Sequence, residues 1–465
     1  MYHDTLPVAA EGYVTIDGNH FAIDGQTWFP LMLNYKAEVR HVGEDIQVVP
    51  AGYYHGNDIR EHFDTIASWG FNSIRLCLDV LDSDMDSAAM FRATRRVIQQ
   101  ADSAGLRVML LIKPPFDPYW QSYTQGLLQT LADLPALWAY DFMNEPLYFD
   151  PVEERDKMDA VRLASLWRHW VRQYAPHQLF TIATAEPIEV FEWDPAILPV
   201  DFIEMHTYHP LRVFSEMWWY SHYCNKPWMV GETGLPADND SVPYDWQIDF
   251  MSETFYWAVS YGAIGYGWWE FQDCPNGVNF EAQYTGLSTA SGQPKHPDVR
   301  FFGYWMCLGP EENPSIPGNY YNMLGYNNIR LTGKVIDKES GLPIEGAVIR
   351  GWNEDWSVGM NTYSDSNGHF TLYSNDYNTH FEISAPGMSR TKFNRKNLKY
   401  KNIGNIDPNN LPNRTLEYQQ IGFQPNFWHC PDGTLIDFIK IDTNQFNKYS
   451  LTADLGTVKL EKLEW

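Results

Sequence analysis

Between residues 28 and 271 the apolar residues fall into short, almost uninterrupted runs that are separated by amphipathic segments. Runs of this kind are typical of strands that are buried on both faces of a parallel sheet. The amphipathic segments between them predict helices, the longest at residues 88–104, 152–174 and 246–260. The eight predicted strands are residues 28–35, 72–79, 107–114, 138–145, 179–186, 201–208, 228–233 and 263–271.

Eight alternations of strand and helix predict an α/β fold, the (β/α)8 or TIM barrel. A doubly wound open sheet is the alternative, but the chain has no Gly-rich phosphate-binding turn after the first strand. Ahead of the barrel, residues 13–24 alternate apolar and polar positions around Gly18-Asn19, which predicts a hairpin. We expect this hairpin to close one end of the barrel.

The pattern changes after residue 307, so we expect two domains, as the length of 465 residues also suggests. Residues 1–307 would form the barrel domain, and residues 308–328, rich in Pro, Gly and Asn, a linker or packed loop. Residues 329–465 would form a smaller all-β sandwich, because short alternating strands are separated there by turn signals. Within it, the Asn-rich residues 394–450 predict a long insertion before a last strand at 455–463.

Charge and composition exclude several classes of protein. The formal charge is −26 and the sequence pI about 4.8, so phosphate backbones are repelled and nucleic acid is not an expected partner. No run of 18 apolar residues is present, so no membrane span is expected. The five cysteines are scattered without a CxxC spacing, which argues against a zinc site or a disulfide framework.

The N-terminal residues lack the basic and apolar regions of a signal peptide. Either the protein is not exported or the chain begins after a removed signal. We expect a secreted, periplasmic or cell-surface protein whose signal has been removed, and a cytoplasmic location is the alternative.

Aromatic residues make up 15% of the chain, with 19 Trp and 28 Tyr. A large aromatic core would explain this content, and so would a cleft in which sugar faces stack on aromatic rings. Several aromatic residues fall in loops that follow predicted strands. Of these, Trp120 and Tyr148 are the best candidates for contact with a substrate.

Polar residues at the ends of the predicted strands are the candidates for chemistry, because a barrel of this type places its active site at the C-terminal ends of its strands. Two of them are glutamates on strands four and seven, which face each other across the barrel. Hydrolysis of a glycosidic bond needs two such carboxyl groups, about 5–5.5 Å apart in retaining enzymes and about 6.5–9.5 Å apart in inverting ones. A glutamate in a strand can also be a buried salt-bridge partner. The strand-end candidates are Arg75, Asn144, Glu145, His206, Tyr208, Glu232 and Trp269.

The motifs around these residues resemble clan A retaining glycoside hydrolases, and glycoside hydrolase family 5 most closely. The resemblance covers residues 13–307. One departure is at residues 112–116, IKPPF, where the family has a histidine and this chain offers Lys113. The matching motifs are Asn144-Glu145-Pro146, His206-x-Tyr208, Gly231-Glu232-x-Gly234, the Trp that ends strand eight and residues 285–295.

The resemblance implies a role for each residue. Glu145 would be the acid/base and Glu232 the nucleophile. Asn144 would bind the sugar hydroxyl next to the reacting carbon, and Trp269 would stack under the sugar. The supporting residues would be Tyr208 and Arg75 beside Glu232, and His206 on the acid/base side.

The C-terminal segment resembles the carboxypeptidase-regulatory-like β-sandwich, which is transthyretin-like in topology. Because no catalytic set is visible in it, we expect a structural or spacer role. The matching residues are Gly333-x-Val335, 341–349, 364–370 and 454–460.

Together these features predict a retaining β-glycoside hydrolase that acts on a β-linked oligo- or polysaccharide by double displacement, without a metal or cofactor. The expected partner is the carbohydrate substrate. A non-catalytic glycan-binding protein on a TIM-barrel scaffold is the alternative. The sequence leaves open the sugar, the choice between endo and exo cleavage, and the oligomeric state.

Overall fold

The structure is a computed structural model of the whole chain. The predicted linker at 308–328 and nearly all of the predicted insertion at 394–450 lie outside the residues it describes. The described residues are 7–80, 85–208, 213–240, 242–278, 280–296, 329–352, 359–374, 380–394, 398–399, 401–402 and 451–464.

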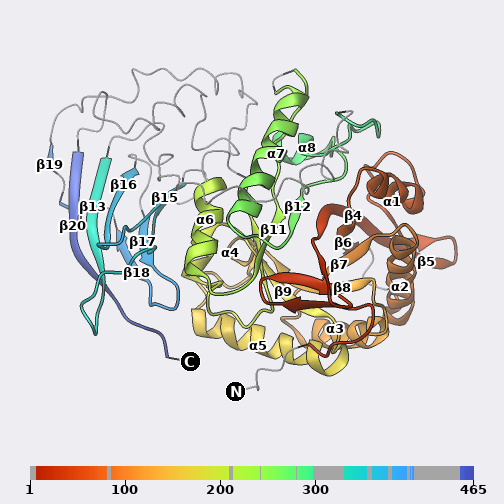
Figure 1. Cartoon of the computed structure of the whole chain (residues 1–465), viewed down its shortest axis with the longest axis horizontal. Helices are drawn as coiled ribbons and strands as arrows, with labels where there is room; N and C mark the ends of the chain where they lie inside the picture. The colour runs from red at the N-terminus through yellow and green to blue at the C-terminus, as the bar shows by residue number, and fades with distance from the viewer. Residues whose placement is uncertain are drawn as a thin grey trace.

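Eight parallel strands of the described chain close into a barrel, because the last of them pairs with the first (Figure 1). This arrangement confirms the predicted TIM barrel, and each strand corresponds to one of the predicted apolar runs. The strands are β4 (Leu31–Val42), β6 (Ser73–Val80), β7 (Arg107–Leu111), β8 (Leu137–Asn144), β9 (Leu179–Thr184), β10 (Ile203–His206), β11 (Trp228–Glu232) and β12 (Tyr266–Trp268).

Helices surround the barrel, and aspartates cap the N-termini of several of them. Asp86, Asp117 and Asp156 each accept a hydrogen bond from a backbone N–H of the first turn that has no partner within the helix. The helices are α1 (Ile59–Ser68), α2 (Ser87–Ser103), α3 (Pro118–Leu131), α4 (Pro146–Phe149), α5 (Lys157–Tyr174), the 3-10 helix η1 (Pro187–Phe191), α6 (Val213–Tyr223), α7 (Tyr244–Ser260) and α8 (Phe280–Tyr284).

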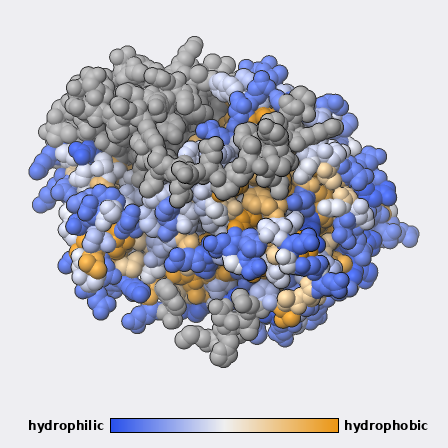
Figure 2. Space-filling model, in the orientation of Figure 1, coloured by the Kyte–Doolittle hydropathy of each residue, from blue (hydrophilic) through white to orange (hydrophobic). Residues whose placement is uncertain are grey.

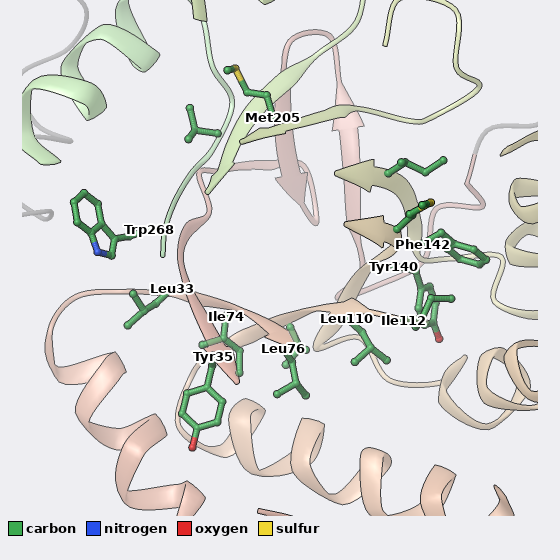
Figure 3. Close-up of a cluster of buried hydrophobic side chains, with 14 of the residues drawn as sticks. Leu33, Tyr35, Ile74, Leu76, Leu110, Ile112, Tyr140, Phe142, Met205 and Trp268 are labelled. Carbon is green, nitrogen blue, oxygen red and sulfur yellow. The ribbon is translucent and has the colours of Figure 1, made fainter. Parts of the chain in front are cut away.

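The main hydrophobic core lies between the barrel strands and the helices. Figure 3 shows part of it, with Tyr35, Leu76 and Leu110 between strands and helices. Trp268 belongs to this layer and packs edge-on against Phe250 of α7. Its neighbour in the chain, Trp269, is therefore the tryptophan of this pair that can face the barrel mouth.

The N-terminal segment forms a three-stranded antiparallel sheet, β1 (Val14–Asp17), β2 (His20–Ile23) and β3 (Gln26–Trp28). Phe21 packs edge-on against both Trp138 and Phe202, which come from the N-terminal ends of barrel strands or just before them. The sheet thus covers one end of the barrel, as the alternation around Gly18 predicts, and leaves the opposite end for the site.

Strand β4 is longer than predicted and continues beyond the barrel into a hairpin with β5 (Asp45–Pro50). Ile46 and Val48 of β5 are buried, and Arg96 of α2 donates a hydrogen bond to the carbonyl of Ile46. The hairpin therefore lies over α2, and the segment after it, with Tyr53 and Tyr54, reaches the barrel mouth.

The C-terminal part contains two four-stranded sheets that share one hydrophobic cluster, including Val335 and Phe370 from one sheet and Ile349 and Phe381 from the other. This all-β arrangement follows the barrel, as predicted, while its likeness to the carboxypeptidase-regulatory-like family remains a prediction. One sheet has the order β16 (His369–Ser374), β13 (Ile329–Asp337), β20 (Leu451–Leu460), β19 (Lys401–Asn402), and the other β15 (Gly359–Tyr363), β14 (Val348–Trp352), β17 (His380–Ser384), β18 (Thr391–Asn394).

The two sheets lie beside α6 and α5 of the barrel (Figure 1). The ammonium of Lys157, buried at the start of α5, donates to Asp194 at 2.9 Å and to Ser384 and the carbonyl of Met388 at 2.9 and 2.8 Å. The Trp219 indole of α6 donates to the carbonyl of Gly346 at 2.8 Å. The buried ammonium of Lys157 and the indole N–H of Trp219 therefore have acceptors in the C-terminal part.

No helix in the described part of the chain combines the length and the apolar character needed to cross a membrane. In the view of Figure 2, hydrophilic residues cover most of the described surface, with smaller hydrophobic areas between them.

Candidate active site

A cavity of about 680 Å³ opens at the C-terminal ends of the barrel strands. Its wall combines carboxylates, cationic side chains and aromatic rings, which is the composition expected of a site for a polar ligand. The main lining residues are Lys36, Arg75, Cys77, Asp79, Asn144, Glu145, Tyr148, Phe149, Glu186, His206, Tyr208, Glu232, Trp269 and Glu281.

Glu145 and Glu232 meet in this cavity from opposite sides of the barrel. A carboxylate oxygen of each and a ring nitrogen of His206 all lie within 4.8 Å of one another. The Glu145 side chain is 17% exposed and the Glu232 side chain 5% exposed. One carboxylate is thus accessible from the cavity while the other lies deeper.

The backbone of Glu145 has a φ of +40°, in the left-handed region that non-glycine residues rarely adopt. The residue follows β8 directly, and its carbonyl accepts hydrogen bonds from the N–H groups of Tyr148 and Phe149 in α4. Its own N–H donates to the carbonyl of Ala183 on β9 at 2.8 Å. Strained backbone of this kind persists where surrounding contacts hold it, and it is concentrated at functional sites.

Arg75 lies fully buried beneath the two glutamates and contacts three carboxylates. It donates to Asp141 at 2.6 Å, lies 3.3 Å from Glu204 and forms an ion pair with Glu232. Burial lowers the pKa of Arg75, but the carboxylates of Asp141, Glu204 and Glu232 outweigh it and hold that pKa well above its usual value. Arg75 therefore supplies a permanent positive charge beside Glu232.

Both oxygens of Glu232 have donors. The guanidinium of Arg75 donates to Oε1, and the Tyr208 hydroxyl donates to Oε2 at 2.5 Å. Arg75 also donates to the side-chain oxygen of Asn144 at 2.8 Å, which leaves the Asn144 amide nitrogen for other partners. The two donors hold the Glu232 carboxylate in a fixed orientation.

His206 lies between the two glutamates. Its Nδ1 is 2.9 Å from Glu145 and 3.5 Å from Glu232, and its Nε2 is 3.7 Å from Glu204. Burial lowers the pKa of His206, but the charge of Glu232, the hydrogen bond to Glu145 and the nearby Glu204 carboxylate outweigh it and raise that pKa to about 10. His206 is therefore a cation at neutral pH and donates to Glu145.

Within the described residues, Glu145, His206 and Glu232 form the set of metal-type ligands that are close enough to share an ion. Arg75 and Tyr208 already bind both oxygens of Glu232, and a cationic His206 has no lone pair for a metal. The group fits a hydrogen-bonded carboxylate pair better than a metal site.

A second polar cluster lies beside Trp269, whose peptide bond to Glu270 is cis. The Lys36 ammonium lies 4.8 Å from the centre of the Trp269 ring and 5.9 Å from that of Tyr53. The hydroxyls of Tyr53 and Tyr54 donate to Glu270 at 3.2 and 2.9 Å. Burial is the main cause that raises the pKa of Glu270 to about 7.

Two more carboxyl groups, Glu186 and Glu281, line the cavity near the central pair. Burial raises the pKa of Glu281 to about 8, with further contributions from Glu145 and Glu232. Outside the cavity lining, Glu189 of η1 is fully buried and accepts from the N–H groups of Leu147 and Ala185 at 3.1 Å. Glu189 thereby ties the loop after β8 to the loop after β9.

The structure brings most of the sequence-predicted site residues together around one cavity. The residue it places elsewhere is Trp120, which is outside the lining. Its ring stacks edge-on against Tyr119 and Tyr123 on α3, with the Lys113 ammonium 4.2 Å from its centre. The residues brought together are Arg75, Asn144, Glu145, Tyr148, His206, Tyr208, Glu232 and Trp269.

Several site residues were not found from the sequence. Glu204 precedes His206 by two positions, so strand alternation places both on the inner face. The same alternation would have found Lys36, two positions after Asn34, and Asp141, which lies inside an apolar run. Glu281 and Glu189 lie outside the barrel strands, in short helices that carry no periodic signal.

Comparison of the sequence with protein-family models and with curated proteins gives no match. Comparison with solved structures finds the exo-beta-1,4-mannosidase Op5Man5 from Opitutaceae bacterium strain TAV5, at a TM-score of 0.51 and 18% identity over 63% of this chain and 62% of that chain. It also finds GH5_18 from Streptomyces cattleya in complex with GlcNAc, at a TM-score of 0.46 and 18% identity over 61% of this chain and 79% of that chain.

This chain therefore spans less than two thirds of the length of the mannosidase. At this identity the likeness to Op5Man5 shows the barrel fold.

Proposed function

We propose that this protein is a retaining β-glycoside hydrolase in which Glu232 is the nucleophile and Glu145 the acid/base. The observation that carries the proposal is the close approach of the two carboxylates, within 4.8 Å between oxygens. Retaining enzymes need carboxyl groups about 5–5.5 Å apart, whereas inverting enzymes leave about 6.5–9.5 Å for a water molecule. The structural neighbour Op5Man5 is an exo-beta-1,4-mannosidase, which agrees with a β-glycoside as substrate.

In the first step, a Glu232 oxygen attacks the anomeric carbon while Glu145 gives its proton to the leaving oxygen. The bond between the anomeric carbon and that oxygen breaks, and the sugar becomes an ester of Glu232. Arg75 and Tyr208 support this assignment, because their hydrogen bonds hold both oxygens of Glu232 in a fixed orientation for the attack.

In the second step, Glu145, now a carboxylate, takes a proton from water. The water oxygen attacks the anomeric carbon, the ester bond to Glu232 breaks, and the product keeps the β configuration. The greater exposure of Glu145 fits a group that must reach the leaving group and then water. His206 donates to Glu145 and can hold its carboxylate in place between the steps.

The test uses Glu145→Ala and Glu232→Ala, each assayed on an aryl β-glycoside with and without azide. Each variant should lose several orders of magnitude in kcat, because each residue acts only in the reaction. Azide should rescue the first variant with a β-glycosyl azide product and the second with an α-glycosyl azide product. NMR of the first-formed anomer from the unaltered enzyme should show retention.

Glu61→Ala is the matched control, since Glu61 is exposed on α1 away from the cavity and its loss should not change kcat. Variants of both candidate glutamates that keep the rate of the unaltered enzyme would exclude the mechanism. If calorimetry shows that an oligosaccharide binds and no product forms, the protein is a non-catalytic glycan-binding protein instead.

A further inference from the structure

We propose that Lys36 is a specificity-determining residue that donates hydrogen bonds to hydroxyl groups of a neutral glycosyl unit bound against Trp269. The inference rests on the proposed function and adds a residue and a substrate class to it. It comes from the position of Lys36 on β4, the contacts of its ammonium group and the charges around it.

The strand register places Lys36 on the inner face of the barrel at its mouth. Asn34 pairs with Arg75 and Lys36 with Cys77 on the neighbouring strand β6. Asn34 points inward, because its amide donates to the carbonyls of Gly231 and Trp268 at 3.0 Å. Side chains two positions apart share a face, so Lys36 is the next inward side chain above Asn34.

The Lys36 ammonium is held in place without using its hydrogen-bond donors. It lies over the rings of Trp269 and Tyr53, an arrangement that attracts a cation but accepts no N–H in the usual sense. Within the described part of the chain, no oxygen is within hydrogen-bonding or salt-bridge range of it. Three N–H donors are therefore available to a molecule in the cavity that Lys36 lines.

The charges of the cavity wall favour a neutral sugar over an acidic one. Carboxyl groups of Asp79 and Glu186 line the cavity in addition to the central pair. An acidic sugar would gain one ion pair with Lys36 and meet repulsion from several carboxylates. The hydroxyl oxygens of a neutral sugar accept from Lys36 without that repulsion.

The experiment compares Lys36→Met with the unaltered enzyme on a panel of aryl β-glycosides. The methionine side chain has a similar length and can still pack on Trp269, but it has no hydrogen-bond donor. Hydrogen bonds to charged groups contribute enough that kcat/KM on the best neutral glycoside should fall about 10- to 100-fold. Lys113→Met removes another lysine that lies over a tryptophan, outside the cavity, and should change kcat/KM less than about twofold.

Deoxy substrates separate a direct contact from a structural effect. One deoxy glycoside lacks the hydroxyl group that Lys36 binds. The kcat/KM of the unaltered enzyme should fall on this substrate by about the same factor as the Lys36→Met substitution lowers kcat/KM on the complete substrate. Lys36→Met should then lose nothing further on that deoxy substrate, and Lys36→Arg should recover part of the rate. Equal rates for Lys36→Met and the unaltered enzyme, additive losses for every deoxy substrate, or faster cleavage of the aryl glucuronide would each overturn the proposal.

If the melting temperature shows that Lys36→Met does not fold, the deoxy substrates still test the role of Lys36 in the unaltered enzyme. No loss on any deoxy substrate would then overturn the role of Lys36. Hydrolysis of neutral glycosides by the unaltered enzyme supports the proposed function independently of this result. If the enzyme cleaves no glycoside at all, the proposed function fails and the role of Lys36 falls with it.

Discussion

Arg75 shows how a single buried side chain can organise a site. Three carboxylates, those of Asp141, Glu204 and Glu232, converge on one guanidinium with no exposed surface. Taking these charges out of water costs free energy, and the planar fork of donors offsets that cost only while all partners are present. The group is therefore a poor site for any substitution, including lysine.

Arg75→Met should lower the free energy of unfolding by about 3–5 kcal/mol, because it leaves buried carboxylates without their cation. Urea denaturation followed by tryptophan fluorescence measures this change. Arg60→Met is the control, since Arg60 forms an exposed ion pair with Asp58, and its loss should leave the stability essentially unchanged. Equal stabilities for the two variants would show that Asp141, Glu204 and Glu232 are not all ionised at the same time.

His206 should make stability depend on pH. Its pKa is raised in the folded protein from an ordinary value of about 6.5 to about 10, so the folded state binds its proton more tightly. The stabilisation is fully present below about pH 6.5 and is lost as the pH rises toward 10. Unfolding at several pH values should show that the stability difference between the unaltered protein and His206→Asn shrinks across this window. A constant difference would mean that His206 is neutral in the fold.

At the scale of elements, the packing of β10 against β11 depends on a glycine. A methyl group added at Gly231 would lie 2.3 Å from the Glu204 side chain, which is itself tied to Arg75. The absent side chain at Gly231 is what lets Glu204 reach the centre of the barrel. Because Glu232 follows directly, a shift of β11 at this point moves the proposed nucleophile.

Gly231→Ala should therefore cost about 1–3 kcal/mol of stability through overpacking and lower kcat as well. Calorimetry and an aryl glycoside assay measure the two effects. Gly52→Ala is the matched control, because the nearest atom to its added methyl group is a Glu38 carboxylate oxygen at 3.3 Å, on a surface that can adjust. Equal effects of both substitutions would exclude close packing as the cause.

The sequence predicts these elements well where burial on both faces produces apolar runs, as in all eight barrel strands. It fails where a strand leaves the barrel: the half of β4 beyond Ala37 alternates with polar residues and pairs with β5, and neither segment has an apolar run. The candidate residues at strand ends, such as Glu145 and Glu232, are predictable because the fold fixes where strands end. Glu281 and Glu189 are not, because only the tertiary structure brings their short helices to the site.

At the scale of the whole molecule, the sheets of the C-terminal part are joined to the barrel by buried polar contacts. Asp194 accepts from Lys157 of α5 and from the N–H of Gly387 in the turn after β17. The same stretch of chain carries Glu189, which holds the N–H of Leu147 two positions after Glu145. A continuous set of contacts thus links the C-terminal sheets to the proposed acid/base.

Lys157→Met should destabilise the protein by about 3–5 kcal/mol, because Asp194 would keep its burial but lose its cation. It should also lower kcat, as the loop that carries Glu189 loses its anchor. Lys338→Met is the control, since Lys338 pairs with Glu461 on the exposed surface of the C-terminal sheets and should leave both quantities essentially unchanged. Full activity in a destabilised Lys157→Met protein would show that the contacts of Lys157 stabilise the fold without affecting the active site.

The contacts of Lys157 also bear on how such a chain can be recombined. In a domain exchange, an accessory domain is replaced by cutting the chain at the domain boundary. Here the helix that begins at Lys157 needs the turn at residues 384–388, and the Trp219 indole needs the carbonyl of Gly346. A chimera that joins this barrel to a different C-terminal domain must also supply these acceptors. The barrel and its C-terminal sheets should therefore be transferred together.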